Sequence, residues 1–488
     1  MRTVLSFIGA FFCASFRMPA LALGLSLLLL TTPTLAGEDA ANAVVTNSLL
    51  DRYTASRDGS FSWSVAQQYQ GPGTRVAALE LTSQTWRDAD EVSHPAWTHM
   101  MQVAVPSAIE AGDLPRTAML FIGGSVRRDA PPRMPDFQVA AMAQMTGSVV
   151  VVVPNVPNQP MILNGDGKRR YEDDLLAETW TTAAREQDPS WIIHLAMVES
   201  AVAAMDAAQA YLATEEGGNI DIEGFVVAGA SKRGWTTWLT AAVDPRVRGI
   251  VPLVIDVMNL PQMIRHHWGA YGFWAPAIGD YAGRQLFNWL GSPESRTLRE
   301  IVDPYLYRDR FTMPKLIMNA AGDEYFLPDT TRYFLDDLPG LTRLRVVPNT
   351  DHAIDKNLDA VQSALGFYAA LINGRPIPEL SWETDPQDPG RMIVTSDTEP
   401  VRVQLWTATN PEARDFRREE IGDVWTATTL EANELGEYTV DLDTPESGFL
   451  AYLVEARYRV EGQDLPIVFS TEVMVLPDVL PFADKPME

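Results

Sequence analysis

Cysteine is almost absent from this chain, which contains only Cys13 among its 488 residues. Disulfide bonds within the chain are therefore excluded, and thiolate metal sites are excluded with them. Cys13 also lies in an N-terminal segment that we expect to be removed, so cysteine-based catalysis is not expected in the mature protein. A chain of this length can dispense with disulfides because it can bury a large hydrophobic core.

Acidic residues are missing from positions 1–36, where Arg2 and Arg17 are the only charged residues. An apolar run covers residues 20–30, and residues 34–36 offer a small-residue cleavage site. This pattern is typical of a secretory signal peptide. The run is shorter than the ~20 residues that a membrane span needs, and no later segment is long and apolar enough. We expect an exported protein, periplasmic or secreted, without a stable membrane span; an N-terminal membrane anchor is the alternative.

Basic residues are few, since 38 lysines and arginines face 64 aspartates and glutamates, and the net charge is −26. Loss of residues 1–36 would remove two arginines and no acidic residue, which changes the net charge to −28. A surface this acidic repels nucleic acid and anionic membranes, so neither is expected as a partner. Solubility outside the cytoplasm is the simplest interpretation, and a cationic partner is the alternative.

Histidine is also scarce, with six residues in the chain. No H-E-x-x-H motif, P-loop or dinucleotide-binding fingerprint is present, and the adjacent His266 and His267 cannot easily bind one metal ion together. We therefore expect neither a metal site nor a cofactor.

What the chain does contain is a series of strand and helix patterns. Segments rich in β-branched and aromatic residues predict early antiparallel strands at 60–69, 75–83 and 96–105. Continuous apolar runs then predict strands buried on both faces, at 118–122, 148–153, 222–228, 249–255, 315–320 and 343–348. Helical patterns alternate with them, at 137–145, 191–212, 232–243, 330–338 and 353–372. This alternation predicts an α/β fold, doubly wound around a mostly parallel sheet.

One interval, residues 258–312, is too long for a single crossover helix and is rich in aromatic residues. Such an insertion is typical of a cap over a substrate pocket, in which Trp268 and Trp274 would contact the substrate. The alternative is a helical insertion whose aromatic residues pack on the body of the protein.

A Pro-rich connection at 375–378 ends the helical rhythm. Short alternating runs follow it, at 391–395, 401–407, 426–430, 436–440, 450–458 and 467–475. Their spacing predicts a β-sandwich of the immunoglobulin or fibronectin type over residues 376–488. The α/β domain would then span residues 37–375.

The chemistry is concentrated at residues 225–235, where an apolar strand runs into a turn of small residues and then a helix. Ser231 lies in this turn between Gly229 and Gly234, in a G-x-S-x-x-G variant of the nucleophile elbow. The serine of such a turn is strained, and its neighbours must be small so that strand and helix can approach each other. Ser231 is therefore the candidate nucleophile.

Two later loops supply the partners that a serine nucleophile needs. Asp323 follows the predicted strand 315–320, and His352 follows the next one. The order Ser, Asp, His is that of an α/β-hydrolase. The imidazole would take the serine proton while the carboxylate holds its tautomer. Asp329 and Asp351 are rival acids, but Asp329 should lie on the next helix and Asp351 is adjacent to the base itself.

The loop after strand 118–122 contains paired glycines, and Gly124 is the candidate for one half of an oxyanion hole. The backbone amide of Lys232 would be the other donor. An ordinary tight turn is the alternative for the glycine loop. The side chains of Lys232 and Arg233 would either hold an anionic substrate or be solvated on their helix.

The chain also resembles a known family, the PhoPQ-activated pathogenicity-related proteins of the PqaA type. The resemblance runs from about residue 51 to about residue 476, and the matching segments are Val153-Pro154-Asn155, Gln159-Pro160, Arg170-Tyr171-Glu172-Asp173, Thr179-Trp180, Ala204-Met205-Asp206, Gly229–Gly234, Gly322–Phe326, Pro328-Asp329 and Val347–His352. It implies an α/β-hydrolase of the bacterial envelope or a secreted one, without naming a reaction. The elbow is also similar to that of glucuronoyl esterases, whose basic residue after the serine assists the oxyanion, and Lys232 stands at that place here.

Two functions remain open on the sequence. The first is an exported serine hydrolase that cleaves an ester, or less readily an amide, of a small molecule, peptide or carbohydrate through an acyl-enzyme on Ser231. The second is a secreted binding or signalling protein that retains a hydrolase scaffold without catalysis. The sequence gives no indication of the oligomeric state.

Overall fold

The structure is a computed structural model that describes residues 46–107, 114–127, 130–290, 292, 295–385 and 387–487. The predicted signal peptide and Cys13 lie outside the described residues. Within the described ranges, no helix combines the length and the apolar character that crossing a membrane requires.

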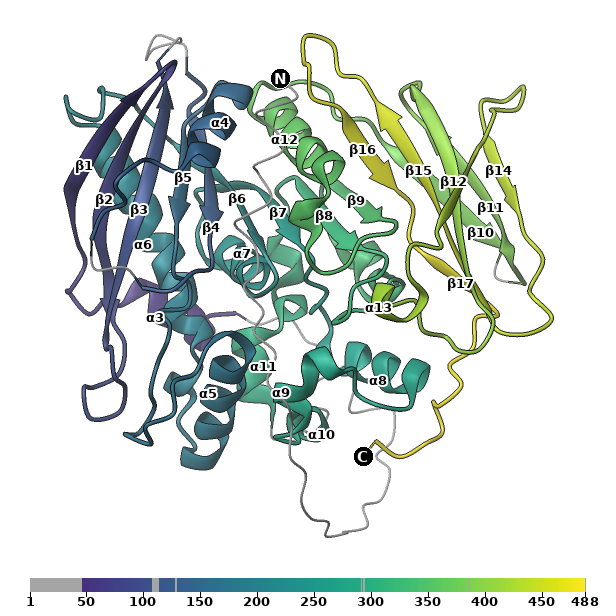
Figure 1. Ribbon diagram of the computed structural model, residues 1–488, viewed down its shortest axis with the longest axis horizontal. Helices are drawn as coiled ribbons and strands as arrows, with labels where there is room; N and C mark the ends of the chain where they lie inside the picture. Colours follow the sequence, from purple (N-terminus) through teal and green to yellow (C-terminus); the bar gives the residue numbers. More distant parts are fainter. Residues whose placement is uncertain are drawn as a thin grey trace.

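A nine-stranded sheet runs through the molecule in the order β1-β2-β3-β5-β4-β6-β7-β8-β9 (Figure 1). The strands are β1 (Ser62–Gly71), β2 (Thr74–Thr85), β3 (Ala96–Pro106), β4 (Thr117–Ile122), β5 (Val150–Val153), β6 (Gly224–Ala230), β7 (Val247–Leu253), β8 (Lys315–Ala320) and β9 (Thr342–Val347). The first three strands pair antiparallel, β3 meets β5 antiparallel, and all later neighbours are parallel. The predicted mostly parallel sheet is confirmed, and its topology is that of the α/β-hydrolase fold.

Helices cover both faces of this sheet because the central strands are apolar on both sides. Along β6, Phe225 and Val227 belong to the core shared with α6 (His194–Leu212) and α7 (Lys232–Val243). The alternate residues Val226 and Ala228 belong to the core shared with α4 (Phe137–Thr146) and α12 (Leu358–Ile372). Successive side chains of a strand point to opposite faces, so a strand buried on both faces reads as one continuous apolar run.

Three local predictions are wrong. The helix predicted at 330–338 is two short 3₁₀ helices, Thr330–Tyr333 and Leu335–Asp337, separated by Phe334, whose φ of −156° is not helical. The single run predicted at 467–475 is two strands, β16 (Ile467–Ser470) and β17 (Met474–Leu476), which both pair with β15. The helix predicted from residue 353 begins at Leu358, where the Asn357 side chain caps it.

The structure also contains α5 (Glu172–Glu186), which the sequence patterns did not predict. This helix begins with three acidic residues and joins the segment after β5 to the region of α6. Its first two residues, Glu172 and Asp173, contact Lys232 of the elbow.

The insertion between β7 and β8 is helical. It contains α8 (Leu260–Tyr271), α9 (Gly279–Ala282), α10 (Leu286–Leu290) and α11 (Arg296–Val302), and α8, α9 and α10 lie together (Figure 1). Whether residues 258–312 act as a cap stays a prediction.

The C-terminal part forms two antiparallel sheets of a β-sandwich, beside the β9 edge of the large sheet (Figure 1). Their strands are β10 (Leu380–Asp385), β11 (Asp388–Ser396), β12 (Arg402–Asn410), β13 (Thr426–Thr429), β14 (Tyr438–Asp441), β15 (Phe449–Tyr458), β16 and β17. The sandwich shares its core with the hydrolase body, since the Ser363 hydroxyl of α12 donates to the Val468 carbonyl at 3.2 Å and Val346 N–H donates to Ser470 Oγ at 2.8 Å. The division into domains at residue 375 stays a prediction.

Candidate active site

Ser231 lies in the turn between β6 and α7, in a conformation that few residues adopt. Its backbone has φ 57° and ψ −128°, and its N–H donates to the Leu253 carbonyl at 2.8 Å. A Cβ on Gly229 would lie 2.6 Å from the Arg233 carbonyl oxygen, and one on Gly234 would lie 2.6 Å from an Ile255 methyl carbon. Both neighbours must therefore be glycine, because strand and helix approach too closely for a side chain.

His352 and Asp323 meet in the loops that follow β9 and β8. Asp323 Oδ2 lies 2.8 Å from His352 Nδ1, and both side chains are buried. The other ring nitrogen, His352 Nε2, is buried without a hydrogen-bond partner among the described residues. The carboxylate thus holds one side of the ring and leaves the opposite nitrogen for a reacting group.

The pKa of His352 follows from these surroundings. Burial in itself lowers the pKa of the imidazole, but the negative charge of Asp323 outweighs it and holds that pKa above its ordinary value. The ring of Tyr325 packs on the imidazole with centroids 4.3 Å apart. The His352 N–H donates to Glu324 Oε2 at 3.0 Å, which fixes the loop.

No hydrogen bond joins Ser231 Oγ to His352 Nε2 among the described residues. The two residues nevertheless follow strands of one parallel set, and the charge of Lys232, next to Ser231, influences the pKa of His352. Hydrogen bonds of catalytic groups are often loose in a resting enzyme and tighten with substrate.

The rival acids have other partners. Asp329 is fully buried between His266 Nε2 at 2.9 Å and Arg414 Nη2 at 2.6 Å. Asp351 is half-buried and pairs with Arg418 at 3.2 Å. Neither carboxylate contacts the imidazole of His352 in the described structure.

The Lys232 side chain is buried rather than solvated. Its Nζ lies 2.8 Å from Asp173 Oδ2 and 3.3 Å from Glu172 Oε2. Burial alone would lower the pKa of this ammonium, but the two carboxylates outweigh burial and hold that pKa above its ordinary value. Tyr281 of the insertion donates its hydroxyl to Asp173 Oδ1 at 3.0 Å, so the insertion reaches the residues behind the elbow.

Arg233 is likewise buried, and its guanidinium forms a bidentate pair with Glu172 at 2.6 and 2.7 Å. The same guanidinium lies against Gly124, where an added Cβ would be 2.6 Å from its central carbon. Burial raises the pKa of Glu172, but the charges of Arg233 and Lys232 outweigh it and hold that pKa well below its ordinary value. The guanidinium that packs against the glycine loop is thus held in place by its ion pair with Glu172 of α5.

Sequence reasoning missed three residues of this arrangement, namely Gln159, Glu172 and Asp173. The Gln159 side-chain amide donates to the Ser125 carbonyl at 3.0 Å and to Glu172 Oε1 at 2.6 Å, and so ties the glycine loop to α5. The sequence did hold a signal for the two acidic residues, because two basic residues directly after a buried elbow need acidic partners. The Glu172-Asp173 pair at the start of α5 supplies them.

The two tryptophans proposed to contact substrate pack within the insertion. Trp268 is buried and packs at a tilt on Trp274 with centroids 5.0 Å apart. Its indole N–H donates to the Lys485 carbonyl at 3.1 Å. Trp274 is partly buried and also packs on Phe287 at 4.5 Å. These contacts fit the alternative in which the aromatic residues of the insertion pack on the protein. A role of the two tryptophans in substrate binding stays a prediction.

A segment of the sandwich contacts both the acid loop and the histidine loop. Arg418 N–H donates to the Gly322 carbonyl at 2.9 Å, next to Asp323. Asn349, three residues before His352, exchanges two hydrogen bonds with Trp425. The acid loop and the histidine loop are therefore positioned partly by the C-terminal sheets.

No group of three or more metal-ligating side chains is found in the ranges that the structure describes.

A model of the PhoPQ-activated pathogenicity-related protein family matches residues 50–417. The chain belongs to this family. The match covers the elbow, the acid and histidine loops, and the sandwich as far as Arg417. The Autocrine proliferation repressor protein A of Dictyostelium discoideum is 33% identical over 465 residues, which cover 90% of this chain and 92% of that protein.

Several solved esterases and a peptidase are distantly similar. An acetyl xylan esterase from Thermoanaerobacterium matches with 14% identity and a TM-score of 0.40, over 64% of this chain and 92% of that one. A glucuronoyl esterase from Solibacter usitatus matches with 13% identity and a TM-score of 0.41, over 67% and 92%. An acylaminoacyl peptidase from Pyrococcus horikoshii has 11% identity and a TM-score of 0.37, over 62% and 49%. Likeness at this level does not bear on what the chain acts on.

Proposed function

We propose that this protein is an exported serine hydrolase that cleaves an ester through an acyl-enzyme on Ser231. The observation that carries the proposal is the Asp323–His352 pair, 2.8 Å apart, with a buried and unpartnered Nε2 on the far side of the ring. The strained turn that presents Ser231 supports it, because such a turn costs folding energy that a purely structural serine would not need.

The residues account for each step of the reaction. Ser231 Oγ attacks the ester carbonyl carbon while its proton passes to His352 Nε2. The negative oxygen of the tetrahedral intermediate accepts hydrogen bonds from the backbone N–H groups of Gly124 and Lys232. The C–O bond then breaks, and the leaving alkoxide takes the proton from Nε2. A water molecule then attacks the acyl-enzyme while its proton passes to His352 Nε2. The bond to Ser231 Oγ breaks, Oγ takes the proton back, and the acid is released.

The charges around the elbow indicate what charge the substrate carries. Lys232 and Arg233 are each already paired with carboxylates of α5, so neither needs an anionic substrate for neutralisation. A neutral ester of a small molecule, peptide or carbohydrate fits this balance. Ester cleavage is favoured over amide cleavage because the chain shows no separate domain that would grip a peptide.

One experiment tests the proposal. Hydrolysis of short p-nitrophenyl esters is measured for the mature protein, for Ser231→Ala, and for Ser107→Ala, an exposed turn residue directly after β3, as a matched control. The expected result is a loss of roughly 10³-fold or more for Ser231→Ala alone. Equal rates for the wild type and Ser231→Ala would refute the serine mechanism.

Export is tested separately. Expression of the whole chain in a Gram-negative bacterium should yield a mature protein in the periplasm or medium whose N-terminus is Gly37. A protein that keeps Met1 and remains in the cytoplasm would contradict this part of the proposal.

A second candidate is a secreted signalling protein on a hydrolase scaffold, and one observation favours it. The relative of 33% identity is named as an autocrine repressor of proliferation. This candidate predicts that Ser231→Ala retains whatever effect the protein has on cells, whereas the enzymatic proposal predicts that the effect is lost with hydrolysis.

A further inference from the structure

Tyr325 belongs to the family segment Gly322–Phe326 and has no part in the reaction proposed for Ser231. It follows Asp323 by two residues, and its backbone N–H donates to Asp323 Oδ1 at 2.8 Å. Its backbone is therefore fixed to the same carboxylate that holds His352. Ser231, Asp323 and His352 are each no more than 6% exposed, whereas the side chain of Tyr325 is partly exposed. Tyr325 thus extends from the buried site toward solvent.

The ring of Tyr325 lies beside both the base and the elbow. Its centroid is 4.3 Å from that of the His352 imidazole, and 6.0 Å from Nζ of Lys232, the residue after Ser231. An ionised Tyr325 would raise the pKa of Lys232 and that of Tyr281, which indicates that its hydroxyl lies toward these two side chains. The hydroxyl end is therefore turned to the elbow and the insertion, and the ring is left to contact a substrate.

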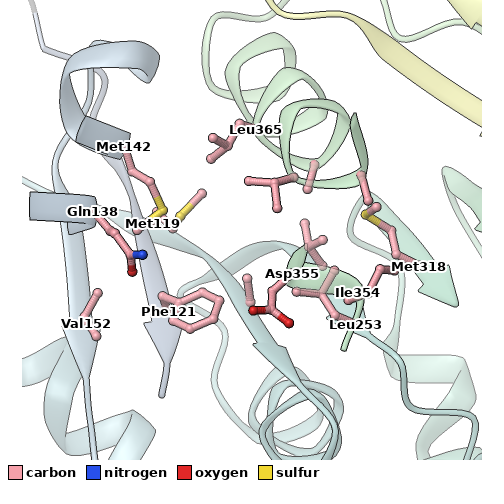
Figure 2. Close-up of a pocket in the computed structure, with 15 residues that line it drawn as sticks. Met119, Phe121, Gln138, Met142, Val152, Leu253, Met318, Ile354, Asp355 and Leu365 are labelled. Atoms are coloured by element: carbon pink, nitrogen blue, oxygen red, sulfur yellow. The ribbon is translucent and has the colours of Figure 1, made fainter. Parts of the chain in front are cut away.

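An apolar cavity that adjoins these loops is too small to take the substrate instead. It lies between α4, α12 and the sheet, and Leu253, Ile354 and Asp355 form part of its lining (Figure 2). Its volume is about 70 Å³. That is roughly half of the ~150 Å³ of a cavity that holds benzene. The groups of a substrate must therefore lie outside this cavity, next to the partly exposed side chains of the acid loop.

The path of the proton determines which part of the ester lies next to Tyr325. The proton that His352 Nε2 takes from Ser231 passes to the oxygen of the leaving alkoxide, so this oxygen must come within hydrogen-bond distance of the imidazole. The groups that this oxygen carries then lie close to the side chain that packs on the imidazole, which is Tyr325. The alcohol part of the ester, rather than the acyl part, would therefore contact Tyr325.

The surroundings of the ring favour a neutral aromatic group. A cationic group would meet Lys232 beside the ring, and an anionic group would meet Glu324, whose Oε2 accepts the His352 N–H at 3.0 Å. Aromatic pairs adopt both offset-stacked and edge-to-face arrangements, so an aromatic group can pack on whichever part of the ring is exposed. Phe326 adds a second ring, with its centroid 6.2 Å from that of Tyr325.

We propose that Tyr325 determines the specificity of this site by packing on the alcohol part of the substrate, and that this part carries a neutral aromatic ring. The inference rests on the proposed ester hydrolysis at Ser231. Two esters with the same acyl group, benzyl acetate and ethyl acetate, differ only in the alcohol part. Both form the same acetyl-enzyme, so a difference in kcat/KM between them reports on binding and acylation alone.

The test is the ratio of kcat/KM for benzyl acetate to kcat/KM for ethyl acetate. We expect a ratio of about ten or more in the mature wild-type protein. Tyr325→Ala should lower the ratio about fivefold or more, because the aromatic contact is lost, whereas Tyr325→Phe keeps the ring and should stay within about twofold of the wild type. A displaced His352 would slow both esters equally, so a positioning role alone would leave the ratio unchanged.

Tyr438→Ala, at a partly buried tyrosine of β14 in the sandwich, is the matched control and should keep the ratio. Thermal unfolding shows whether each variant folds, and Tyr325→Leu, with an expected fall of about threefold or more, replaces Tyr325→Ala if that variant does not. A smaller ratio in the wild type, or a ratio that loss of the ring leaves unchanged, would overturn this inference while hydrolysis at Ser231 stands. A wild type that neither hydrolyses the two esters nor reacts with a fluorophosphonate would refute the proposed function, and the inference with it.

Discussion

Asn349 and Trp425 exchange two hydrogen bonds across the boundary between the hydrolase body and the sandwich. Asn349 Nδ2 donates to the Trp425 carbonyl at 2.9 Å, and the Trp425 N–H donates to Asn349 Oδ1 at 3.0 Å. Asn349 lies in the loop that carries His352. The position of the candidate base therefore depends on a residue 73 positions later than the base itself, beyond three strands of the sandwich.

Asn349→Ala should lower kcat about tenfold with little change in KM, because the histidine loop loses its tie while the substrate contacts remain. The unpaired backbone groups of Trp425 should also lower the free energy of unfolding, by on the order of 1–3 kcal/mol. Steady-state kinetics and urea unfolding measure both effects. Asn433→Ala, which removes hydrogen bonds in an exposed loop of the sandwich, is the control and should change neither.

Asp323→Asn should reduce kcat by roughly 10²–10⁴-fold, because the amide cannot hold the imidazole in the required tautomer or stabilise its charged form. Asp351→Asn removes the charge that pairs with Arg418, while its amide oxygen can still accept the Ala353 N–H, so it should change kcat by less than about threefold. The two variants are compared on one activated ester. Equal effects would mean that Asp323 has no special role.

The activity should depend on His352 being neutral. Since Asp323 raises the pKa of His352 above its ordinary 6.5, kcat/KM should increase with pH and reach half its maximum above pH 6.5. Glu324 also raises this pKa, and Lys232 lowers it. In Asp323→Asn the midpoint should move to lower pH, because the main stabilising charge is gone. A pH profile and ¹⁵N NMR of the ring test this, and an unchanged midpoint would argue against the pairing.

Gly124→Ala should disturb the candidate oxyanion hole. Its Cβ would lie 2.6 Å from the Arg233 guanidinium, which Glu172 holds in place, so the glycine loop must move. Loss of one donor of an oxyanion hole costs roughly 10²–10³ in kcat. Gly123→Ala is the matched control, because the nearest atom would be 3.6 Å away and the change should be tolerated. Similar kinetics for both variants would place the oxyanion hole elsewhere.

The parts of this structure that sequence patterns predicted are those set by local chemistry. The continuous apolar runs of β4, β5, β6 and β8 identify strands buried on both faces. The small residues around Ser231 identify the turn, since only glycine fits there. The order of the residues along the chain was enough to select Asp323 and His352, each of which follows a predicted strand.

Other parts depend on contacts between distant segments. The pairing of Lys232 with Asp173 joins residues 59 apart in the chain, and no periodicity encodes it. The contacts of Arg418 and Trp425 with the loops of Asp323 and His352 arise from how the sandwich packs on β9 and α12. The 3₁₀ turns after Asp329 replace a helix because buried contacts of Asp329 with His266 and Arg414 outweigh a weak local preference.

The central claim is that Ser231 is an activated nucleophile, and covalent labelling tests it most directly. The mature protein is treated with a fluorophosphonate, digested, and analysed by mass spectrometry. The account predicts one adduct per chain, on Ser231, that forms more slowly in Asp323→Asn and is absent from Ser231→Ala. An unlabelled protein, or an adduct on another serine, would contradict it.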